Sequence, residues 1–107
     1  MIKVIYDREY NRVTVEGHAQ SGEVGHDLVC ASVSILVHTL ASFVDNMRSA
    51  KQVYNPKTEL KSGEALIRCD APRKYKSSVT LVFDSICAGF ELLARDYPKN
   101  ISYEMKI

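Results

Sequence analysis

One short segment of this 107-residue sequence combines side chains that can carry out nucleophilic chemistry. It contains His18, the glycines Gly22 and Gly25, Asp27 and Cys30. A thiolate is a strong nucleophile, and an imidazole within hydrogen-bond reach can accept its proton. The segment therefore indicates acyl transfer, with Cys30 as the nucleophile and His18 as its base.

A helix start beside this cysteine would favour the same chemistry. Asp27 is a residue type that caps helices, so we expect a helix to begin there. Cys30 would then be the third helical residue, where unpaired amides and the helix dipole favour a thiolate. The same amides can hold an oxyanion. His18 lies where the preceding strand should end, and we expect it to meet Cys30.

Two further polar residues are candidates for supporting roles. Ser34 lies one helical turn beyond Cys30, where it can hydrogen-bond near the thiolate or the substrate. Asp27 has two interpretations that do not exclude each other. It either caps the helix or orients His18 as the third member of a triad.

The other histidines and the glycines have weaker assignments. His26 can also reach Cys30 and stays open as an alternative base, whereas His38 lies roughly 12 Å further along the helix axis. Gly22 and Gly25 match no phosphate-binding motif. We expect them to belong to a mobile loop, residues 19–26, that is ordered by substrate.

The elements that must position these residues follow from hydrophobic periodicity. Alternation of apolar residues predicts strands, and apolar residues at three- and four-residue steps predict helices. The first helix carries a second apolar set, Leu28, Ile35 and Val37, and we expect it to be buried on more than one side. Ser77 or Ser78 is expected to cap the second helix. The predicted strands cover 2–6, 13–17, 58–61, 64–69 and 101–107, and the predicted helices cover 27–47 and 78–97.

This order, ββαββαβ, predicts an α+β fold with a single mixed or antiparallel sheet of about five strands and two helices. The length supports one domain, residues 1–107, that we expect to be a cysteine protease domain.

Composition limits the partners. The net charge is +1, so we expect no strong nucleic-acid binding and no attraction to membranes. We see no apolar run of roughly 18 residues and no signal-like start, and we expect a cytoplasmic protein. Three cysteines without CxxC spacing indicate reduced thiols, of which Cys69 and Cys87 fall in core patterns. We expect no metal and no cofactor.

Two other functions fit parts of the sequence. A metal site can be built from His18, His26 and Cys30, because the last two are four positions apart and can share a helical face. A non-enzymatic, ribosome-associated binding module can use the basic segment at residues 73–76.

The same segment resembles a known family. Gly17-His18-Ala19, Gly25, Asp27, Val29-Cys30-Ala31 and Val33-Ser34 resemble, in order and spacing, the signature of the ribosomal-processing cysteine protease Prp family. The rest of the chain fits that family in length and in its order of strands and helices. Ser32 stands where an alanine is more usual.

The resemblance implies a function. It implies removal of the N-terminal extension from a bacterial large-subunit ribosomal protein, number twenty-seven, by a homodimeric enzyme. The family's catalytic pair falls on His18 and Cys30, with Asp27 and Ser34 near the site. The glycines of the loop match a segment thought to move when substrate binds.

Overall fold

The structure, a computed structural model, describes residues 1–19 and 25–107. The predicted α+β class and the order ββαββαβ are confirmed. The elements are β1 (Ile2–Asp7), β2 (Arg12–Glu16), α1 (His26–Ser49), β3 (Tyr54–Lys61), β4 (Glu64–Asp70), α2 (Lys76–Asp96) and β5 (Ile101–Lys106).

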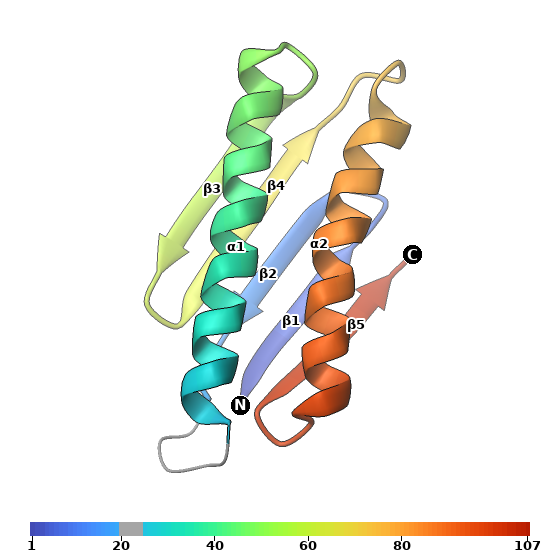
Figure 1. The fold of residues 1–107 in the computed structure, drawn as a ribbon. Coiled ribbons are helices and arrows are strands. Elements are labelled where there is room, and N and C mark those ends of the chain that lie inside the picture. Colours follow the sequence, from blue (N-terminus) through green and yellow to red (C-terminus); the bar gives the residue numbers. More distant parts are fainter. Residues whose placement is uncertain (20–24) are drawn as a thin grey trace.

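The strands form one five-stranded sheet in the order β3-β4-β2-β1-β5. The pair β1 and β5 is parallel and the other neighbours are antiparallel, so the sheet is mixed. Both helices cover the same face of this sheet (Figure 1). In β1 the alternation of Ile2, Val4 and Tyr6 places all three side chains in the core.

The core lies between the helices and the sheet, and α1 also contacts α2. The expectation that α1 is buried on more than one side was wrong. Val37 is buried, but Leu28 and Ile35 are 54% and 64% exposed because they lie on the side of α1 away from the sheet. The largest buried side chains are those of Tyr6, Phe83, Phe90, Leu40, Ile67 and Ile101.

Strand β3 begins earlier than its sequence predicted. It starts at Tyr54 and includes Asn55 and Pro56, which precede the predicted start at residue 58. Its pairing with β4 is irregular between Tyr54 and Lys57, and Asn55 has a φ of 49°. Because β3 is an edge strand, a proline and a bulge can be accommodated there.

Both helices are long and apolar enough, by length and composition, to cross a membrane. Their mean hydropathies over 18-residue windows are 1.8 and 1.4, which differs from the expectation that no segment would reach this limit. A core helix passes the same test, and each of these helices packs a buried stripe of side chains into the common core.

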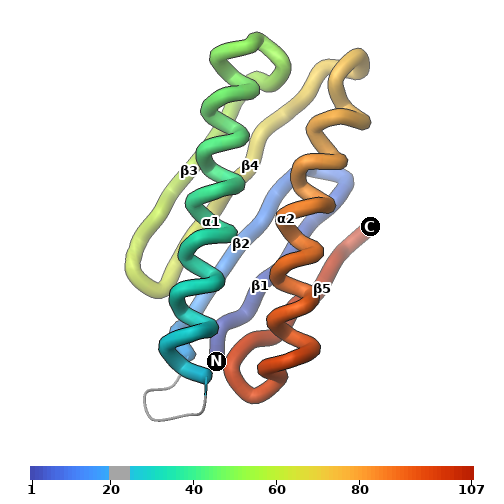
Figure 2. The backbone as a smooth tube through the Cα atoms, in the orientation of Figure 1, coloured from blue at the N-terminus to red at the C-terminus, as the bar shows by residue number. Residues whose placement is uncertain are grey.

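The topology brings three separate segments toward one end of the molecule. The end of β2, the start of α1 and the turn between β3 and β4 all lie toward this end, which is also where the N-terminus lies (Figure 2). The residues that follow β2, the first turns of α1 and the β3–β4 turn therefore line one cavity, although the β3–β4 turn lies far from the other two segments in sequence.

Candidate active site

The first turns of α1 carry Cys30. The helix begins at His26 and its N-cap is Gly25, so the prediction that Asp27 caps the helix was wrong. The Val29 amide donates to the Gly25 carbonyl at 2.8 Å, which closes the first turn. Cys30 is therefore the fifth helical residue and not the third. The effect of the helix end falls off within one turn, so it favours a thiolate less than predicted.

Gly25 explains where the helix starts. Its φ is 86°, a left-handed value that favours glycine. A Cβ at this position would also lie 2.7 and 2.8 Å from two ring carbons of Tyr97. The glycine therefore lets the chain enter α1 close to the end of α2. Gly22, the other glycine of the predicted substrate loop, lies outside the described residues.

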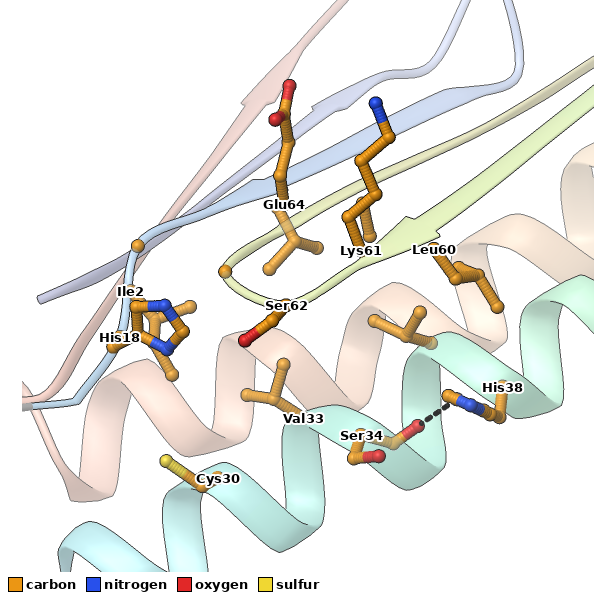
Figure 3. Close-up of a pocket in the computed structure, with 15 residues that line it drawn as sticks. Ile2, His18, Cys30, Val33, Ser34, His38, Leu60, Lys61, Ser62 and Glu64 are labelled. Carbon is orange, nitrogen blue, oxygen red and sulfur yellow. Dashed lines mark hydrogen bonds between the residues drawn. The ribbon is translucent and has the colours of Figure 1, made fainter.

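His18 follows β2 and shares a cavity with Cys30. The cavity has a volume of about 300 Å³, and His18 and Cys30 line the same end of it (Figure 3). His18 is exposed and Cys30 is half-buried. Around them the lining consists of Ile2, Val15, Gly17, Val33, Ser34, Val37, His38, Leu60, Lys61, Ser62, Gly63, Glu64 and Ala65. The structure thus brings the predicted nucleophile and base to one solvent-accessible space.

The two supporting candidates have different positions. Ser34 lines the cavity one turn after Cys30, as predicted. Asp27 does not line it: its side chain is fully exposed, and its nearest ionic neighbour is His26, with 3.8 Å between Oδ1 and Nε2. Of its two predicted roles, the helix cap is contradicted, and the geometry gives no contact with His18.

The remaining histidines both lie near the site. His26 Nδ1 is 4.0 Å from the Cys30 sulfur, so the alternative base left open by the sequence has a defined position. His38 lies at the far end of the cavity, where its Nδ1 donates to the Ser34 carbonyl at 3.1 Å.

Sequence reasoning missed the hairpin tip, residues 61–64 between β3 and β4. Its residues form one wall of the cavity, and Ser62 and Lys61 are visible opposite α1 in Figure 3. In the sequence, Ser62 and Gly63 indicate only a turn, and no spacing rule connects them with His18 some 45 positions earlier. The place of the hairpin tip in the cavity is therefore visible only in the three-dimensional structure and not in the sequence.

No group of three or more His, Cys, Asp or Glu side chains that could hold a metal ion occurs among residues 1–19 and 25–107. The metal site considered for His18, His26 and Cys30 is therefore not assembled in this structure.

The family model described as cysteine protease Prp matches residues 1–102. The chain belongs to the Prp family. It is a cysteine protease, and the resemblance noted from its motif is confirmed. A search of curated proteins finds no match.

Solved structures share the Prp fold. A ribosomal processing protease Prp from Staphylococcus aureus, with a covalently linked product peptide, has a TM-score of 0.72 and 24% identity over 99% of this chain and 100% of its own. The same protease with a substrate peptide has a TM-score of 0.70 and 21% identity, covering 98% and 97%. SMU.848 from Streptococcus mutans has a TM-score of 0.65 and 26% identity, covering 97% and 90%.

The three thiols of this Prp protease differ in accessibility. Cys69 and Cys87 are buried, as predicted, and neither lines the cavity. Burial, with Asp70 nearby, raises the pKa of Cys69 to about 11, and burial, with Asp84 nearby, raises the pKa of Cys87 to about 12. Both thiols therefore stay protonated at neutral pH, and Cys30 is the thiol that a peptide can reach.

Proposed function

We propose that residues 1–107 act as one endopeptidase domain in which Cys30 is the nucleophile and His18 is the base. The observation that carries this assignment is the shared cavity, which Cys30 enters from α1 and His18 enters from the end of β2. Of the three thiols in this cysteine protease, Cys30 lines a cavity while the other two are buried.

The reaction follows from these two groups. His18 takes the thiol proton, and the sulfur of Cys30 attacks the peptide carbonyl carbon, whose oxygen takes up the displaced electron pair. Amides in the first turn of α1, which lack partners within the helix, are suited to stabilise that oxyanion. The imidazolium then gives its proton to the leaving nitrogen as the C–N bond breaks and a thioester remains.

Hydrolysis of the thioester restores the enzyme. A water molecule gives one proton to His18 while its oxygen attacks the thioester carbonyl, and the C–S bond breaks as the tetrahedral intermediate collapses. The sulfur leaves as a thiolate that recovers the proton from His18. The new carboxyl end of the peptide then departs.

We propose that the substrate is the N-terminal extension of the large-subunit ribosomal protein number twenty-seven. Membership of the Prp family supports this substrate. So does the fold shared with a ribosomal processing protease whose structures hold a substrate and a product peptide.

Incubating the purified protein with that precursor should shorten it at one position near its N-terminus. Mass spectrometry of the products identifies the bond that is cut. The matched control is the same ribosomal protein without its extension, which should remain intact. A precursor that is unchanged after long incubation, or one cut at many positions, would contradict the proposed substrate.

We propose further that the protein is cytoplasmic, acts without strong nucleic-acid or membrane binding, and forms a homodimer. The outward face of α1 supports self-association. Leu28, Ile35 and Phe43 are 54%, 64% and 44% exposed there. The sequence from Leu28 to Val44 contains no Asp, Glu, Lys or Arg. A solvent-facing helix side normally carries charges, and the core of an interface is depleted of them.

Light scattering should therefore give twice the 12.0 kDa mass of the chain. Ile35→Glu should shift the protein toward monomers, because it would place a charge within the apolar face. Leu81→Glu is the matched control, since Leu81 is equally exposed, at 65%, but lies on α2. A wild-type protein that is monomeric at every concentration would rule the dimer out.

A further inference from the structure

The imidazole of His18 lies against the backbone of the hairpin tip. A Cβ built on Gly63 would collide with His18 Nε2 and would lie 2.9 Å from Cε1 and 3.1 Å from Cδ2. All three atoms belong to the ring, so the ring occupies the space that a side chain at this position would need. Figure 3 shows His18 beside the turn that carries Ser62 and Glu64.

A backbone hydrogen bond fixes the hairpin tip relative to His18. Strands β2 and β4 pair up to Glu16 and Glu64, and the Gly17 amide donates to the Gly63 carbonyl at 2.8 Å just beyond that pair. His18 is the next residue. The hairpin tip therefore holds the backbone before His18 and also contacts its ring.

Gly17 directs His18 toward the hairpin tip. Its φ is 93°, and a Cβ there would collide with the Met1 carbonyl oxygen. The chain consequently leaves β2 in a conformation and at a distance from β1 that only glycine permits. The chain leaves β2 at Gly17 in this conformation, and the side chain of the next residue, His18, lies against Gly63.

We propose that Gly63 is a positioning residue for the protease reaction: its missing side chain lets the imidazole of His18 lie on the hairpin tip at the edge of the cavity that holds Cys30. This inference rests on the proposed function, in which His18 is the base. A side chain at position 63 would push the ring from this place. Misplacing a catalytic group by about 1 Å can cost on the order of 10²-fold in rate.

Two variants of Gly63 distinguish the loss of the contact with the His18 ring from a change in the conformation of the turn. Gly63 has a φ of 75°, which disfavours Ala, whereas Asn adopts such values more readily. Gly63→Ala and Gly63→Asn both introduce a Cβ against the ring. We expect both to lower kcat on precursor cleavage by roughly 10²-fold, because the new Cβ displaces the ring, with a smaller change in KM, because position 63 also belongs to the cavity wall.

Gly89→Ala is the matched control. It adds the same methyl group to a glycine in α2, where the new Cβ would meet the flexible side chain of Leu36 at 2.8 Å and not His18. It should leave kcat unchanged. Thermal unfolding supplies a second readout: Gly63→Ala should lower Tm less in a His18→Ala background than in the wild type, since the ring that it collides with is then gone.

The outcomes distinguish this inference from the proposed function. If His18→Ala keeps full activity, the proposed base is wrong. If His18→Ala is inactive but both Gly63 variants keep the wild-type kcat, the positioning role is wrong and the base assignment stands. A loss in Gly63→Ala that Gly63→Asn fully restores would show that the turn conformation alone matters, and this too would overturn the inference.

Discussion

Replacing Cys30 by Ala or Ser should abolish cleavage of the precursor, with a loss in kcat of about 10⁴-fold or more. Alanine removes the nucleophile. Serine keeps an atom that can attack, but a hydroxyl is far harder to deprotonate than a thiol, and a single histidine does not compensate for this. The rate of product formation, followed by mass spectrometry, measures the loss.

The fold should survive both changes, because Cys30 is only half-buried and lies in a regular part of α1. Ser32→Ala is the matched control on the same helix, since Ser32 does not line the cavity. Full activity in Cys30→Ala would show that Cys30 is not the nucleophile.

Iodoacetamide at neutral pH should modify Cys30 and inactivate the wild type, leaving Cys69 and Cys87 unmodified because burial raises their pKa values.

The sequence predicted the order of elements because each segment has a clear hydrophobic period. In β1 and in α1 the buried residues recur at the steps that a strand and a helix require. The same periodicity misjudged the outer face of α1, where Leu28 and Ile35 are exposed. A pattern shows which residues are apolar, but it does not show how many neighbours are available to cover them.

Helix starts were harder to predict than helices. Asp27 and Ser77 or Ser78 are good capping residues, yet α1 is capped by Gly25 and α2 by Tyr75, neither with a side-chain cap hydrogen bond. At Gly25 the close approach of Tyr97 decides where the chain turns, and that contact joins residues far apart in sequence. Local propensity is overridden by tertiary packing at this position.

Only part of the site was predictable, because the rest of it also depends on contacts between residues far apart in sequence. His18, Cys30 and Ser34 could be identified because they lie within one short segment that surrounds a helix start. The contributions of Leu60 and Gly63 depend on the pairing of β3 with β4 and of β4 with β2, which together place the hairpin tip beside His18. A single sequence records both partners of such a pairing but not their register.

His18→Ala should lower kcat by about 10²- to 10⁴-fold, which is the range that a general base contributes. Combining it with Cys30→Ala should add little, since a nucleophile and its base act as a unit. His26 must be compared with His18 as the base, because His26 Nδ1 is only 4.0 Å from the Cys30 sulfur. His26→Ala therefore removes a second imidazole next to the same thiol.

We expect the loss in His26→Ala to be far smaller than in His18→Ala. His18 lines the cavity in which the peptide must lie, so it can reach both the thiol and the leaving nitrogen, whereas His26 does not line that cavity. A base that contacts the sulfur from outside the cavity can accept the thiol proton but cannot deliver it to the departing amine. Measuring kcat for both variants on the same precursor tests this difference. An inactive His26→Ala beside an active His18→Ala would make His26 the base and would assign His18 to another role in the cavity.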